Sequence, residues 1–141
     1  IEIDNNDLRM ARINANDLLD ENEYRLIKFL KVYYVRSSLI KNYDLIIANP
    51  PYLNQNEMNL IKNGPVRYEP IKALFGGKDG MDFYRIINKL IIKHLNPKGI
   101  AIMEMGNQDI EIYKEIFSKE LSLTFKKDQN NKYRCLIISH Q

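Results

Sequence analysis

Cysteine, tryptophan and long apolar runs are scarce or absent in this sequence. Cys135 is the one cysteine, so an internal disulfide and a cysteine-rich zinc site are both excluded. The apolar stretches are short, as at 45–48, and none approaches the roughly 18 residues that span a membrane. No basic segment followed by an apolar block indicates a signal peptide. We therefore expect a cytoplasmic protein with no membrane partner.

A marked excess of charge of one sign is also missing. The 141 residues carry 21 Lys and Arg against 18 Asp and Glu, and the resulting net charge of +3 is scattered along the chain. So weak a positive balance does not by itself predict nucleic-acid binding. No cluster of side chains has metal-ligand spacing, and no metal is expected. With 45% apolar and 28% charged residues, the chain is predicted to form a single domain over 1–141 with a buried core.

Glycine is absent from the first 63 residues, whereas residues 63–78 hold three of the six glycines and two of the five prolines. A loop this long inside a compact domain is usually functional. Before and after this loop, segments with the apolar spacing of strands alternate with segments that have the apolar spacing of helices. This order predicts an α/β sandwich whose sheet is mostly parallel and ends in an antiparallel C-terminal strand pair. The expected strands are 1–4, 30–35, 44–48, 100–105, 121–127 and 133–139, and the expected helices are 7–16, 56–62, 79–95 and 110–119.

The sequence Asn49-Pro50-Pro51-Tyr52 follows the expected strand 44–48 without a spacer. Two successive prolines remove two backbone N–H donors and fix φ, so this corner offers carbonyl acceptors on a stiff frame. Asn49 adds a side-chain carbonyl, and Tyr52 can cover a flat group. Such a corner suits a planar NH₂ group, whose nitrogen it would orient toward an electrophile. The alternative is a turn that only ends the strand.

Asp4 ends the first expected strand, and ligands of open α/β sheets bind beyond the carboxyl ends of the strands. Its carboxylate could accept two hydrogen bonds from a ribose diol, as acidic residues do in nucleotide-binding sheets. The alternative is an N-cap for the helix that follows, and one carboxylate can serve both purposes.

Together these residues resemble the S-adenosylmethionine-dependent methyltransferases, and specifically the release-factor glutamine methyltransferases of the PrmC/HemK family. The Asn-Pro-Pro-Tyr motif is shared with enzymes that methylate the exocyclic amine of adenine, so it selects only the broad class. Further segments are similar to the glutamine family and cover essentially the whole chain: 8–15, 44–52, 66–70, 73–80, 84–87, 95–99, 104–108, 127–128 and Arg134.

The resemblance implies a Rossmann-like class I methyltransferase sandwich and transfer of a methyl group from S-adenosylmethionine to a glutamine side-chain amide. In this family the glutamine lies in the Gly-Gly-Gln loop of a peptide-chain release factor, the expected protein partner. By position, Asn49 and the Pro50 carbonyl would bind the amide hydrogens and carry the catalysis. Pro51 would set the corner and Tyr52 would pack on the amide.

Further roles are implied at the substrate-facing loop and around the cofactor. Arg67, Tyr68 and Glu69 would shape the substrate-facing loop. Asp4, together with Asn49 and two further positions, would contact the cofactor. Of those two, Ser38 replaces an aspartate that would accept from the adenine amine, and Leu39 would pack on the adenine edge.

The resemblance also has departures. The family's first strand, its glycine-rich cofactor loop and its N-terminal helical domain have no counterpart in the sequence, so we expect an incomplete catalytic domain. Two alternatives to the glutamine methyltransferase follow. One is a nucleic-acid adenine amino-methyltransferase, which would bind nucleic acid through a basic surface. The other is a non-catalytic remnant that does not bind the cofactor.

Overall fold

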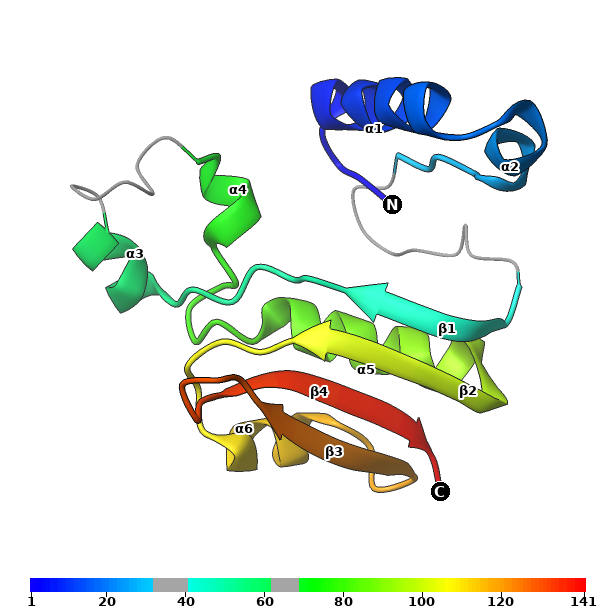
Figure 1. Cartoon of the computed structure of the whole chain (residues 1–141). Helices are drawn as coiled ribbons and strands as arrows, with labels where there is room; N and C mark the ends of the chain where they lie inside the picture. The colour runs from blue at the N-terminus through cyan, green and yellow to red at the C-terminus, as the bar shows by residue number, and fades with distance from the viewer. Residues whose placement is uncertain (32–40, 62–68) are drawn as a thin grey trace. The chain divides into compact units, whose positions relative to one another are not determined.

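The computed structural model describes residues 1–31, 41–61 and 69–141 (Figure 1). The chain divides into two compact units, Ile1–Ile40 and Lys41–Gln141, which are described separately below. The prediction of a single, incomplete catalytic domain over 1–141 stays a prediction. Part of the expected strand 30–35 lies outside the described residues. No helix in the described ranges is long and apolar enough to cross a membrane.

The first unit contains two helices, each begun by an aspartate. Helix α1 (Asn5–Leu18) has Asp4 as its N-cap, and helix α2 (Glu21–Leu26) has Asp20 in a capping box. An aspartate cap satisfies backbone N–H groups that a helix start would otherwise leave unpaired. The caps explain why α1 starts two residues before its predicted position and why α2 forms in a polar segment for which no element is predicted.

Among the described residues of this unit, the two expected strands meet through one bridge. Glu2 pairs in parallel with Lys31, and the Glu2 amide donates to the Leu30 carbonyl at 3.0 Å. The parallel direction agrees with the prediction, although the described pairing is too short to form a ladder.

The second unit is built on a four-stranded sheet with strand order β1-β2-β4-β3. Strands β1 and β2 run parallel, whereas β2 pairs with β4, and β3 with β4, in antiparallel fashion. The antiparallel C-terminal pair is confirmed, but the described sheet is mixed rather than mostly parallel, because two of its three ladders, β2–β4 and β3–β4, are antiparallel. The strands are β1 (Tyr43–Ala48), β2 (Leu95–Glu104), β3 (Leu121–Lys127) and β4 (Tyr133–His140).

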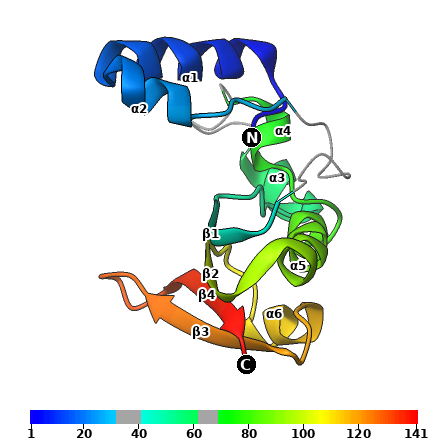
Figure 2. The same ribbon diagram turned by 90° about the vertical axis from the view of Figure 1, so that its right-hand side faces the viewer.

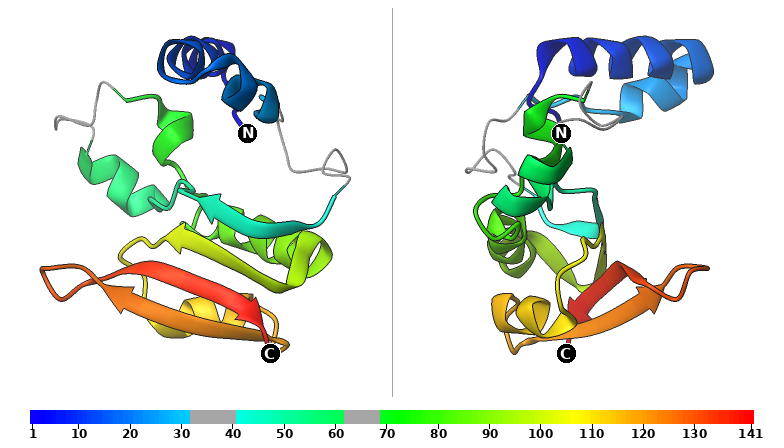
Figure 3. Two further views of the ribbon diagram at one scale, coloured as in Figure 1. Left: turned by 45° about the vertical axis from the view of Figure 1, so that its right-hand side comes forward. Right: turned by 90° about the vertical axis from the view of Figure 1, so that its left-hand side faces the viewer.

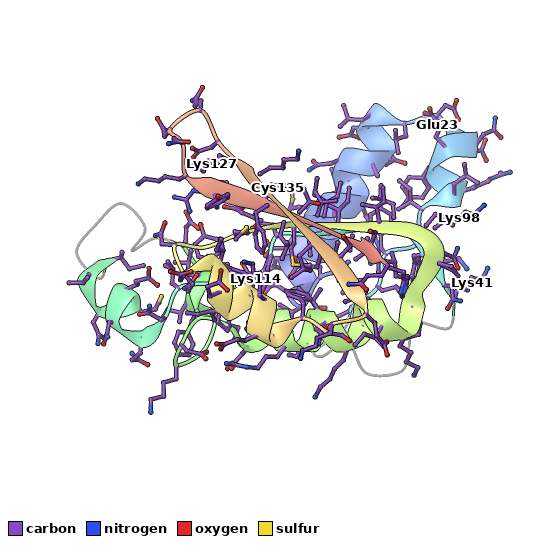
Figure 4. All side chains as sticks on the ribbon, turned by 90° about the horizontal axis from the view of Figure 1, so that it is seen from below. Glu23, Lys41, Lys98, Lys114, Lys127 and Cys135 are labelled. Carbon is purple, nitrogen blue, oxygen red and sulfur yellow. The ribbon has the colours of Figure 1, made fainter. Side chains whose placement is uncertain are left out.

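Helices α5 (Asp82–His94) and α6 (Ile110–Ile116) cover the same face of this sheet, as Figures 2 and 4 show from two directions. Tyr84 of α5 and Tyr113 of α6 are fully buried and meet edge to face, with ring centroids 5.0 Å apart. Edge-to-face contact is a favoured geometry for aromatic pairs. The two tyrosines therefore join both helices in one core with the sheet.

The apolar run at 45–48 is buried on one face only. Ile46 and Ala48 pack against the core, whereas the alternate side chains of Leu45 and Ile47 are 53% and 73% exposed. On β2 the partner of Leu45, Ile100, is 43% exposed. A continuous apolar run is typical of a strand buried on both faces, but Leu45 and Ile47 of β1 lie on an exposed face.

Strand β2 starts five residues before its predicted position. Leu95 pairs with Tyr43, and the next pair in the ladder is Ile100 with Leu45, so residues 96–99 are an insertion within the strand. Gly99 is needed there because a Cβ at that position would lie 2.9 Å from the Tyr43 carbonyl oxygen. Strand β2 therefore begins directly after α5, and residues 96–99 do not end its pairing with β1.

Candidate active site

Two parallel strands end at the same edge of the sheet. The segment 49–52 follows the last residue of β1, and β2 ends beside it at Glu104. Helices α3 (Gln55–Ile61) and α4 (Ile71–Leu74) lie beyond this edge, as both panels of Figure 3 show. Short α4 falls within the predicted loop 63–78. The carboxyl ends of parallel strands are where open α/β sheets bind ligands.

A cleft of about 440 Å³ opens at this edge. It brings together five of the predicted site residues, from the corner and from the loop that follows α3. Arg67 and Tyr68 lie outside the described residues, as do Ser38 and Leu39. The described lining consists of Asn49, Pro50, Pro51, Tyr52, Leu53, Ile61, Glu69, Ala73, Leu74 and Glu104.

Three glycines allow backbone and side chains to close in around the corner. A Cβ on Gly76 would lie 2.7 Å from the Pro51 carbonyl oxygen, and one on Gly80 would lie 2.3 Å from the Tyr52 carbonyl oxygen. A Cβ on Gly106 would lie 2.8 Å from the Tyr52 ring. Because real Cβ atoms do not approach this closely, only glycine fits at these three positions. The loop that carries Gly76 and Gly80 and the segment that carries Gly106 thus pack against the Asn-Pro-Pro-Tyr segment.

Tyr52 is held at its hydroxyl by the last residue of β2 and at its carbonyl by the segment that follows β2. Its hydroxyl donates to Glu104 Oε1 at 3.3 Å, and its carbonyl accepts from Gln108 Nε2 at 2.9 Å. Burial raises the pKa of the Tyr52 phenol, and the charge of Glu104 raises it further. The phenol is therefore a neutral hydrogen-bond donor at neutral pH, and its ring is fixed beside the cleft.

A second layer of hydrogen bonds fixes the segment after β2 to the core. Tyr84 donates to the Glu104 carbonyl at 2.8 Å. The Tyr113 hydroxyl accepts from the Gly106 amide at 3.0 Å and donates to Gln108 Oε1 at 3.3 Å. Burial raises the pKa of both phenols, so both remain hydrogen-bond donors at neutral pH. Tyr84 and Tyr113 thereby fix Glu104 and Gln108, the two residues that bond Tyr52.

The loop before α5 pairs directly with the corner. The Leu53 amide donates to the Leu74 carbonyl, and the Gly76 amide donates to the Leu53 carbonyl, both at 2.9 Å. Further along, Arg85 bonds both carboxylate oxygens of Asp79, with 3.1 Å between Nη1 and Oδ1. These bonds tie the loop to the corner at one end and to helix α5 at the other.

Replacing Asp79 by asparagine is expected to remove a pH-dependent part of the stability. The Arg85 guanidinium lowers the pKa of Asp79 from 3.8 to about 2. A lowered carboxyl pKa stabilises the fold above the unfolded value of 3.8, and this contribution disappears as the pH falls through about 2. Because half of the Asp79 side chain is exposed, we expect no more than about 1 kcal/mol.

Urea unfolding of the wild type and of Asp79→Asn between pH 7 and pH 2 measures this contribution. The two proteins are expected to differ at pH 7 and to converge at pH 2. Asp17→Asn, on exposed helix surface, is the control and is expected to follow the wild type throughout. A difference that stays constant down to pH 2 would contradict the assignment to the Asp79 charge.

Asp4 belongs to the first unit, where the structure places it as the N-cap of α1. Its Oδ1 atom accepts from the Asn6 amide at 2.7 Å, and the residue is exposed. The capping alternative is therefore correct. A carboxylate offers about four lone-pair sites, so one bond to the backbone leaves acceptors for a ribose diol. These free acceptor sites fit the ribose-binding role of Asp4, which stays a prediction.

The residues missed by sequence reasoning lie at the end of β2 and just after it. Glu104 lines the cleft, and Gly106 and Gln108 contact Tyr52, but none has a predicted role. The only signal was that 104–108 belongs to the segments that carry the resemblance. Among the described residues, no group of His, Cys, Asp or Glu side chains is placed to hold a metal ion.

The fold of the described chain is that of a class I methyltransferase. Among solved structures it is similar to the hMettl16 catalytic domain in complex with a MAT2A 3′UTR hairpin, with a TM-score of 0.67 at 18% identity over 98% of this chain and 53% of that one. It is also similar to the delta-N METTL16 MTase domain, with a TM-score of 0.55 at 19% identity over 98% of this chain and 59% of that one. No protein-family model matches the chain.

The sequence relatives narrow the class and confirm the resemblance to release factor glutamine methyltransferases. The enzyme of that name from Pasteurella multocida is 33% identical over 107 residues, 76% of this chain and 36% of the relative. That from Clostridium acetobutylicum is 36% identical over 90 residues, 62% of this chain and 32% of the relative. The ribosomal protein uL3 glutamine methyltransferase of Neisseria meningitidis serogroup A is 39% identical over 73% of this chain and 33% of the relative. The chain thus spans about a third of the length of these relatives.

Proposed function

We propose that this chain carries the substrate-binding corner of an S-adenosylmethionine-dependent methyltransferase that modifies the side-chain amide of a protein glutamine. The protein substrate is a peptide-chain release factor, and the glutamine is that of its Gly-Gly-Gln loop. The observation that carries the proposal is the Asn49–Tyr52 corner, which lines a cleft at the carboxyl edge of the sheet. The names of the sequence relatives support the same reaction.

The chemistry of the corner follows from its hydrogen-bond acceptors. An amide nitrogen is a poor nucleophile because its lone pair is delocalised into the carbonyl. Asn49 Oδ1 and the Pro50 carbonyl would accept its two N–H groups, which returns electron density to nitrogen and fixes its direction. Tyr52, fixed through Glu104 and Gln108, would pack on the planar amide.

S-adenosylmethionine, when bound, supplies a methyl group on a positively charged sulfur. The amide nitrogen held at the corner would take the methyl carbon, the electrons of the carbon–sulfur bond would stay on sulfur, and the nitrogen would give up one proton. Asn49 is exposed, so the proton released beside it can pass to water. Asp4 would hold the ribose hydroxyls, and Ser38 and Leu39 would lie at the adenine.

The charges of the cleft favour a protein substrate over nucleic acid. Within the described lining, the two charged side chains are both acidic, Glu69 and Glu104. Nucleic acids carry a negative phosphate at every nucleotide and are bound through Lys and Arg. A neutral glutamine brought by a protein loop meets no such repulsion.

A transfer assay with S-adenosylmethionine labelled in its methyl group tests the proposal. We expect label in a release factor and none in the same factor with its Gly-Gly-Gln glutamine replaced by alanine. Ribosomal protein uL3 and adenine-containing DNA serve as competing substrates. Label in DNA but not in the factor would replace the proposal by the adenine alternative. Label in uL3 alone would change the protein substrate, and no label anywhere would favour the non-catalytic remnant.

A further inference from the structure

Glu104 is the half-buried acidic side chain of the cleft. It ends β2, lines the cleft together with Asn49 and Pro50, and accepts the Tyr52 hydroxyl at 3.3 Å through Oε1. That bond is its one side-chain hydrogen bond among the described residues. The second oxygen, Oε2, is thus available to a ligand. Glu69, the other acidic residue of the described lining, is exposed, so water screens its charge more strongly.

The Asn-Pro-Pro-Tyr corner alone does not separate glutamine from glutamate. The two side chains have the same shape and differ in carrying NH₂ or O⁻ at one position. An asparagine side chain can rotate by half a turn and offer its own NH₂ to a carboxylate. Asn49 could therefore hold either side chain. A group that only accepts hydrogen bonds, and that carries negative charge, favours the amide and opposes the carboxylate.

Resting on the proposed function, we propose that Glu104 is the residue that makes this cleft select a carboxamide over a carboxylate. An ionised carboxylate has no donor to offer, and the Pro50 carbonyl beside it has none either. The Tyr84 bond to the Glu104 carbonyl fixes the end of β2 and keeps the acidic side chain at the cleft. Glu104 thus acts on the substrate by charge, in addition to positioning the Tyr52 ring.

The test compares two capped tripeptides, acetyl-Gly-Gly-Gln-amide and acetyl-Gly-Gly-Glu-amide, by calorimetric titration of the whole chain at pH 7. The wild type is expected to bind the glutamine peptide at least about tenfold more tightly, since like charges within a cleft repel strongly. In Glu104→Gln, which keeps an acceptor for Tyr52, we expect this preference to fall to about threefold or less. Glu104→Asp keeps the charge and is expected to keep the preference.

Glu115→Gln is the matched control, because Glu115 is exposed on α6 and lies outside the cleft. Circular dichroism of each variant checks that it folds. Glu104→Asp tests the proposal even if Glu104→Gln does not fold, because loss of the preference in Glu104→Asp would contradict the proposal. Equal preference in the wild type and in Glu104→Gln would overturn it, as would a wild type that binds neither peptide or both equally. Methyl transfer measured on the same preparations separates the two proposals: selective binding without transfer contradicts only the proposed function, and transfer with an unchanged preference contradicts only the role of Glu104.

Discussion

Replacing Asn49 by alanine is expected to lower methyl transfer to the glutamine amide by about a hundredfold or more, because one of two acceptors for the reacting NH₂ group is lost. The remaining acceptor, the Pro50 carbonyl, holds one N–H and leaves the nitrogen free to rotate away from the methyl group. Asn49 is exposed and follows the end of β1, so its side chain contributes little to the core. The free energy of unfolding should therefore change by less than about 0.5 kcal/mol.

The measurement is the initial rate of label transfer to the release factor, together with a urea unfolding curve for each protein. Asn59→Ala, an exposed asparagine on α3, removes the same amide from a position outside the cleft and should leave the rate unchanged. Full activity in Asn49→Ala would remove Asn49 from the mechanism. A loss of activity that parallels a loss of stability would assign Asn49 a structural role instead.

Strong local periodicity made much of the second unit predictable. Helices 79–95 and 110–119 and the strands 121–127 and 133–139 correspond to α5, α6, β3 and β4 within a few residues at each end. In these segments the apolar spacing, the helix-ending residues and the turn residues all point the same way, as is typical of consistent sequences. Agreement of several local signals is what fixed these elements.

Pairing between distant segments was less predictable. The sequence at 96–99 indicates a turn, but only the ladder between β1 and β2 shows that Leu95 already pairs with Tyr43. In the same way, the apolar spacing of β1 does not say which face is covered, and Leu45 and Ile47 prove to be exposed. Burial depends on what packs against a strand, and that is not encoded in the strand's own pattern.

The chemistry of the Asn-Pro-Pro-Tyr corner could be predicted from the sequence, whereas the contacts that hold Tyr52 in place could not. Proline removes donors wherever it lies, so the acceptor-rich character of Asn49-Pro50-Pro51 follows from the residue types. Tyr52 is braced by Glu104 and by Gln108, which lie 52 and 56 positions further along the chain. Nothing in the local sequence of either partner specifies such a contact. The resemblance to known enzymes marked the segment, and the structure supplied its role.

Replacing Gly80 by alanine is expected to cost about 2–4 kcal/mol of stability, the largest effect of a single substitution outside the core. Gly80 has φ of +81°, which L side chains rarely adopt, and its Cβ would lie 2.3 Å from the Tyr52 carbonyl oxygen. The same Cβ would lie 2.6 Å from Gln108 Nε2, so the Gln108 bond to Tyr52 would also be broken. Backbone strain and a lost hydrogen bond add to one another here.

Gly77→Ala is the matched comparison, because Gly77 also has a positive φ, +98°, but the three atoms nearest to its Cβ would all belong to the Asp82 side chain. An exposed carboxylate can rotate away, whereas the Tyr52 carbonyl belongs to a corner that two prolines hold rigid. Urea unfolding is therefore expected to show a loss for Gly80→Ala that exceeds the loss for Gly77→Ala by about 1 kcal/mol or more. Equal losses would mean that only the positive φ matters at both positions. In that case the loop would not be fitted to the Tyr52 backbone, and the close packing around the corner would have no part in holding the site.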